Sequence, residues 1–100
     1  MLPQILSAVR QWLLRIDLPG EILTDREDTL RVIFETGNAL AELIVADSGS
    51  APYRFVSFQV LDTRLDPTDA PVFTFHDSET STIGDILREL DHGIAFVQTL

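Results

Sequence analysis

With 100 residues, the chain has room for a single domain, over residues 1–100, built around one hydrophobic core. An apolar fraction of 45% and a charged fraction of 23% are typical of folded globular proteins rather than of disordered chains. The sequence contains no cysteine, which excludes disulfides, thiolate zinc sites and thiol nucleophiles.

The charge balance is strongly acidic: 16 Asp and Glu residues stand against seven basic residues, for a formal net charge of -9. Phosphate backbones and anionic lipids repel such a surface, so we expect no direct binding to nucleic acid or to membranes. A protein partner with a basic surface would instead be attracted and steered toward it. The alternative is that the charge only keeps a small protein soluble.

No stretch approaches the roughly 20 uninterrupted apolar residues of a membrane helix. Arg10 and Arg15 interrupt the apolar N-terminal segment, and no basic region precedes it, which argues against a signal peptide. We therefore expect a cytoplasmic protein, and an export route without a recognisable signal stays open.

The N-terminal segment predicts an amphipathic helix from about residue 3 to 16. Its apolar residues return at helical spacing on one face, and they are Ile5, Val9, Trp12, Leu13 and Ile16. Pro3 suits a first turn, and Pro19 with Gly20 ends the pattern. We interpret Trp12 as a core anchor rather than as a platform for a ligand.

Residues 29–49 predict two strands joined by a tight hairpin turn at Gly37-Asn38. Such a pair supplies the positive φ angles that a two-residue loop needs. Apolar side chains alternate with others on both sides of the turn, as they do in half-buried strands.

A turn at residues 47–52 separates this hairpin from a third strand, expected over residues 53–63. On that strand Val56, Phe58 and Val60 share the face that we expect the helices to cover. A longer loop follows, and then a short last strand over residues 72–76 with Phe73 and Phe75 pointing inward.

A second helix is predicted to begin after Thr82, because apolar residues again follow helical spacing from Ile83 onward. Thr82 and Asp85 form an acidic variant of the capping box, in which each side chain bonds the backbone N–H of the other residue. Gly93 either ends this helix or only weakens it. Together the elements predict an α+β fold of two layers: an antiparallel sheet of about four or five strands, covered by an N-terminal and a C-terminal helix.

Residues 72–92 contain both histidines of the chain, which raises the question of a reactive or metal-binding cluster. His76 and Asp77 are neighbours on a strand, so their side chains point to opposite faces and do not converge on one ion. The sequence also lacks zinc-protease, phosphate-loop and serine-hydrolase motifs. We therefore predict no catalytic residue, no metal site and no cofactor.

Three short motifs resemble small bacterial immunity proteins of polymorphic toxin systems, the TriTu-like group in particular. They are a strand ending in Ser48-Gly49, a strand end at Val60-Leu61-Asp62, and His76 near the close of the last strand. The similarity covers about residues 28–92. It implies a non-enzymatic protein that binds one cognate toxin and blocks its active site. Two positions depart from the pattern, since Ala46 replaces an aromatic residue and the loop 63–71 is long.

Three classes of function follow from the sequence. The first is an acidic inhibitor or immunity protein, and the second is a secretion-chaperone-like homodimer that binds effector segments. The third is a small enzyme or metal protein that uses His76. For the first class, the residues expected to contact a basic partner are acids that strands and loops could present together. They are Glu35, Glu42, Asp47, Asp62, Asp66 and Asp69.

Overall fold

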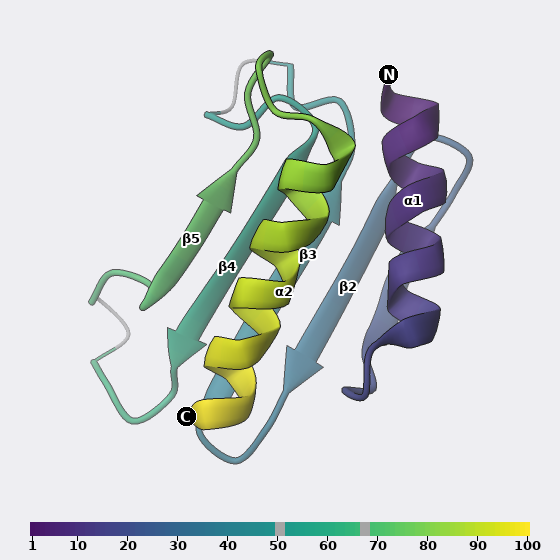
Figure 1. The fold of residues 1–100 in the computed structure, drawn as a ribbon. Coiled ribbons are helices and arrows are strands. Elements are labelled where there is room, and N and C mark those ends of the chain that lie inside the picture. The colour runs from purple at the N-terminus through teal and green to yellow at the C-terminus, as the bar shows by residue number, and fades with distance from the viewer. Residues whose placement is uncertain (50–51, 67–68) are drawn as a thin grey trace.

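Two helices lie on one face of a five-stranded antiparallel sheet, in a computed structural model that describes residues 1–49, 52–66 and 69–100 (Figure 1). The elements are α1 (Leu2–Arg15), β1 (Glu21–Asp25), β2 (Leu30–Glu35), β3 (Ala39–Val45), β4 (Val56–Asp62), β5 (Phe73–His76) and α2 (Ile83–Thr99). The strands follow one another in the sheet in chain order, so each pairs with its sequence neighbour. The predicted two-layer α+β fold is confirmed.

The core lies between the sheet and the helices, and it follows directly from the alternation of side chains along the strands. Val32 pairs with Leu43, and Leu43 pairs with Phe58, so one buried row crosses three strands. Phe73 and Phe75 stand opposite Val60 and Phe58 in the register. The last strand therefore turns its aromatic side chains toward the helices, as expected.

The first strand of the sheet was not predicted. β1 pairs with β2 through an irregular register between Ile22 and Thr24, and most of its residues are exposed. Because the strand is short, bulged and at the edge, it lacks the alternation that marks a half-buried strand.

The turn between β2 and β3 is the predicted two-residue turn at Gly37-Asn38, because Glu35 pairs with Leu40 across it, but it lacks the positive φ angles that were expected. The backbone N–H of Thr36 donates to the carbonyl of Ala39, and Gly49 alone has a positive φ among the described residues. Asn38 explains the difference. Its side-chain amide donates to the carbonyl of Leu100, and its own carbonyl accepts the N–H of Thr63, so contacts to two other elements set this turn.

β4 begins at Val56 rather than at residue 53. The backbone N–H groups that precede it turn toward a side chain, the carboxylate of Asp77. The predicted turn at 47–52 and the loop 63–71 each extend over residues outside the described part, namely 50–51 and 67–68. Neither described helix is long and apolar enough to cross a membrane.

Trp12 joins the three parts of the fold. Its ring packs edge-on against Phe34 of β2, with centroids 6.5 Å apart, and its indole N–H donates to Oδ1 of Asp91 on α2 at 2.8 Å. The side chain is only 2% exposed, which confirms that Trp12 is a core residue. The partner for its N–H satisfies the one polar group that burial of a tryptophan brings inside.

We predict that Trp12→Ala lowers the free energy of unfolding by about 3–5 kcal/mol, as truncation of large buried aromatics does. Leu14 is 87% exposed on the same helix, so Leu14→Ala should change stability by no more than about 0.5 kcal/mol. Urea denaturation followed by circular dichroism measures both. A loss below about 1 kcal/mol for Trp12→Ala would contradict the anchoring role.

Gly93 does not end α2, because the helix continues to Thr99. A Cβ atom at this position would lie 2.6 Å from Cε2 of Phe58 and 3.0 Å from Cε1 of Phe73. The missing side chain therefore lets α2 approach the sheet closely above β4 and β5.

This contact determines whether a substitution at Gly93 stabilises or destabilises the fold. Gly→Ala in an open helix position stabilises by up to about 1 kcal/mol, but Gly93→Ala must displace buried rings, and we expect it to destabilise by about 1–3 kcal/mol. Gly84 is the control on the same helix, since its nearest neighbour would be Oγ1 of Thr82 at 3.8 Å. Thermal unfolding should show a lower midpoint for Gly93→Ala and an unchanged or higher midpoint for Gly84→Ala. Equal shifts in the two variants would refute the close-approach explanation.

The start of α2 has the predicted capping box. Oγ1 of Thr82 accepts the N–H of Asp85, and Oδ2 of Asp85 accepts the N–H of Thr82, each at 3.0 Å. The hydrogen bonds from Thr82, with the nearby charge of Arg88, lower the pKa of Asp85 below its ordinary value. The dense polar sequence before this helix therefore has a structural role at its N-terminus.

Candidate functional site

The face of the sheet that points away from the helices carries no second layer in the described part of the chain (Figure 1). We call it the open face. By the strand register, its central residues are Arg31, Ile33, Glu35, Leu40, Glu42, Ile44, Gln59 and Leu61. A one-sided antiparallel sheet ordinarily presents polar residues to water. Here four aliphatic side chains lie among the polar ones.

Ile33 lies at the centre of the acidic part of this face. Its two cross-strand partners are Glu21 on β1 and Glu42 on β3. Along its own strand, Glu35 and Arg31 are the nearest residues on the same face. Three carboxylates and one guanidinium therefore surround one half-buried aliphatic side chain, a formal balance of -3 + 1 = -2.

A shallow hollow opens beside Ile33, with a volume of about 270 Å³. Its lining consists of Arg31, Ile33, Leu40, Glu42, Gln59 and Leu61. Arg31 crosses to β3 and pairs with Glu42, with Nε donating to Oε2 at 2.7 Å and Nη2 bonded to the same oxygen. We call this feature the Ile33 hollow.

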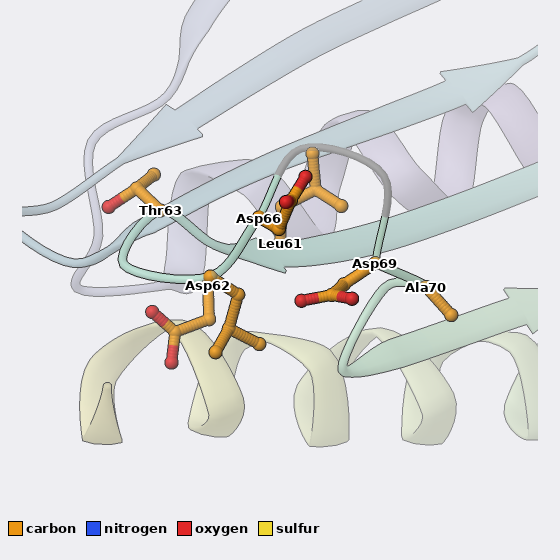
Figure 2. Close-up of a pocket in the computed structure, with 7 residues that line it drawn as sticks. Leu61, Asp62, Thr63, Asp66, Asp69 and Ala70 are labelled. Atoms are coloured by element: carbon orange, nitrogen blue, oxygen red, sulfur yellow. The ribbon is translucent and has the colours of Figure 1, made fainter.

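A second pocket lies where β4 ends, and three of the six predicted acids meet there. Figure 2 shows Asp66 and Asp69 on the loop after β4, with Asp62 at the end of the strand. The pocket is lined by Leu61, Asp62, Thr63, Leu65, Asp66, Asp69 and Ala70. Leu61 lines both this pocket and the Ile33 hollow, so the two are neighbours.

Asp62 is already engaged within the chain. Nε of Arg64 donates to its Oδ1 at 2.9 Å and Nη2 donates to its Oδ2 at 2.8 Å, while the backbone N–H of Arg64 also reaches Oδ1. These bonds, with the charge of Arg64, lower the pKa of Asp62 from 3.8 to about 2. The register places Asp62 on the helix-covered side opposite Ala39, so it lies behind the open face rather than on it.

The low pKa of Asp62 has a testable consequence. A carboxyl with a depressed pKa stabilises the fold at pH values above its ordinary pKa, and this contribution is lost as pH falls from 3.8 toward about 2. Carbon-13 NMR of the Asp62 carboxyl should give a midpoint near 2, and Arg64→Gln should raise it toward 3.8. Arg88→Gln on α2 is the control and should leave the midpoint of Asp62 unchanged. A wild-type midpoint that Arg64→Gln does not move would show that Arg64 is not the cause.

The other predicted acids divide between the two ends of the sheet. Glu35 is exposed at the end of β2 and is in register with Leu40, which pairs with Leu61. Asp47 follows β3 at the opposite end, where its Oδ1 accepts the N–H of Gly49. The predicted set is therefore not one patch. Glu35, Glu42, Asp66 and Asp69 lie on or beside the open face, and Asp47 lies apart from them.

His76 and Asp77 point to opposite sides, as the strand pattern predicts. His76 is in register with Ser57, with its ring 6.0 Å from that of Tyr53. Asp77 is 3% exposed, and its Oδ1 accepts three successive backbone N–H groups, from Arg54, Phe55 and Val56, at 2.7–3.0 Å. Asp77 therefore fastens the segment before β4. Within the described ranges, no group of three or more His, Asp or Glu residues is placed to hold a metal ion.

Sequence reasoning missed the apolar half of this surface. Ile33, Leu40 and Ile44 alternate with the core residues of β2 and β3, so they lie on the open face, which the sequence analysis did not propose as a binding surface. The sequence did contain a signal for this surface. Both β2 and β3 carry aliphatic residues on both of their faces, although two helices can cover only one side of the sheet.

Comparison with known proteins finds no family model, no curated protein and no solved structure that matches this chain. The resemblance to immunity proteins stays a prediction.

Proposed function

We propose that the chain is a non-enzymatic, acidic protein-binding module of the inhibitor type, which neutralises a cognate bacterial toxin by covering a basic surface around its active site. The observation that carries this proposal is the open face, where carboxylates and aliphatic side chains lie side by side and no element among the described residues covers them. The resemblance to immunity proteins over residues 28–92 points to the same class.

The chemistry of the face favours a basic partner. Glu21 and Glu35 add negative charge that no described basic side chain pairs with, and the whole chain carries -9. A field of one sign raises the rate of encounter with an oppositely charged protein, and the effect weakens as salt screens it. Aliphatic residues such as Leu61, which is 40% exposed, then gain by losing contact with water.

A secretion-chaperone-like homodimer is the second candidate. Exposed Ile22 and Leu23 on the edge strand β1 favour it, because an edge strand with apolar side chains is a place where another chain can pair. Charge opposes it, since a second copy would add another -9 to the same assembly. The two candidates differ in oligomeric state and in the sign of the partner's charge.

Co-expression with the products of the flanking genes tests the proposal. If one of them is a toxin, the chain should restore growth of cells that produce it and should form a complex with it. Growth that is not restored, together with a self-associated chain in analytical ultracentrifugation, would favour the chaperone-like candidate.

Charge reversal locates the binding surface once such a toxin is in hand. Glu35→Arg on the open face should slow association by roughly three- to tenfold at low salt, because an acid facing the partner steers the encounter. Glu89→Arg on α2 is the matched control, since it changes the net charge equally, from -9 to -9 + 2 = -7, on the helix-covered side. Stopped-flow association rates at several salt concentrations measure both. Equal slowing by the two variants would show that only total charge matters and would remove the open face as the site.

A further inference from the structure

We propose that the Ile33 hollow seats one arginine side chain of the partner, as the anchor of the complex. This inference rests on the proposed function and makes it specific, because it names the chemical group that the open face recognises. Four observations carry it: the walls of the hollow, the unused acceptors at its rim, its size and the local charge.

The walls suit an aliphatic stem. Ile33, Leu40 and Leu61 come from three adjacent strands and are all partly exposed, so they offer apolar surface to a side chain that enters between them. Arginine carries three methylene groups before its guanidinium, and it commonly packs such a stem on apolar surface while its head stays at the rim.

The rim holds acceptors that the protein itself leaves unused. Both N–H donors that Arg31 directs at Glu42 go to Oε2, and Oε1 of Glu42 accepts no hydrogen bond from the described residues. Gln59 is the cross-strand partner of Glu42, and its side-chain amide makes no hydrogen bond within the same residues. A carboxylate oxygen and an amide carbonyl on neighbouring strands suit the several N–H donors of a planar guanidinium.

The size of the hollow fits one side chain. Its volume of about 270 Å³ is below the roughly 300–1,000 Å³ of pockets that hold whole small molecules. Buried aromatic and arginine side chains at the centre of an interface are the residues that most often dominate binding. The hollow therefore matches an anchor side chain better than a free cofactor or substrate.

The charge around the hollow selects a cation. Glu21, Glu35 and Glu42 against Arg31 leave a formal balance of -2 beside Ile33. Arg31 is already paired with Oε2 of Glu42. An incoming guanidinium would therefore approach the other oxygen of Glu42, Oε1. An acidic or a neutral side chain would gain nothing from this arrangement, and an acidic one would be repelled.

The direct test is an NMR titration of the nitrogen-15-labelled chain with N-acetyl-arginine methylamide. The matched probe is the citrulline analogue, which keeps the shape and hydrogen-bonding outline of arginine but carries no charge. Arginine should shift the backbone amides of Ile33, Leu40, Glu42 and Leu61 with millimolar affinity, and the citrulline probe should bind at least several-fold more weakly. Equal affinities, or shifts confined to Asp66 and Asp69, would overturn the assignment.

Two variants distinguish the contribution of the charge at the rim from that of the apolar walls. Glu42→Gln keeps the shape of the rim and should abolish the preference for arginine over citrulline, whereas Leu61→Ala should weaken both probes to a similar extent. Glu89→Gln on α2 is the control, which should change neither. A preference for arginine that survives Glu42→Gln would show that Glu42 is not the acceptor, and equal binding of N-acetyl-lysine methylamide would remove the role of the guanidinium.

The same variants distinguish this inference from the proposed function. If wild-type and Glu42→Gln chains neutralise the toxin with equal affinity, the hollow is not the anchor and the inhibitor function stands. If the arginine probe binds at the hollow but no toxin is neutralised, the site stands and the inhibitor function fails. If the hollow anchors the toxin, Glu42→Gln should weaken the complex by roughly tenfold or more, as removal of one partner of a charged interface pair does.

Discussion

The position of both helices on one side of the sheet depends on Trp12, which contacts β2 through its ring and α2 through its N–H. α1 cannot leave that side without exposing a large aromatic side chain and breaking its hydrogen bond to Asp91. Gly93 adds to the constraint, because it lets α2 lie close against Phe58. With both helices committed to one layer, the open face has no covering element among the described residues. Under the proposed function, the composition of this face would serve binding rather than folding.

The acids of the chain serve two different purposes, and the distinction explains why net charge alone does not locate a site. Asp77 and Asp85 accept backbone N–H groups, and Asp62 is held by Arg64, so these carboxylates stabilise turns and a helix end. Their hydrogen bonds face the protein. Glu21 and Glu35 stand on the open face beside Ile33, where their charge reaches solvent and any molecule that approaches. An excess of negative charge therefore lies on the side of the sheet that no described element covers.

Much of the fold could be predicted from the sequence, because helical spacing, strand alternation and the Thr82–Asp85 capping box are local patterns. β1 escaped prediction since a short, bulged edge strand has no regular alternation. The turn at Gly37-Asn38 lies where it was predicted, but its φ angles differ from the expected ones, and Asn38 there bonds Leu100, which is distant in sequence. The site was predictable only as a list of acids. A single sequence does not specify loop geometry or strand register. It therefore cannot show which of the acids Arg64 engages or which of them share a face with Leu40.

In the proposed complex, the aliphatic side chains between the carboxylates would give the open face a selectivity that charge alone would lack. A basic protein that docks on Ile33 and Leu61 must remove water from the neighbouring acids, and a carboxylate that loses water without gaining a partner is costly. Glu42 already has Arg31 on one oxygen, so part of this cost is offset before any partner arrives. A partner that brings a cation to the other oxygen completes the pairing, whereas one that brings an apolar or acidic group leaves it incomplete. In the proposed complex, the same residues would attract basic proteins at long range and would reject those that lack a cation at the right position.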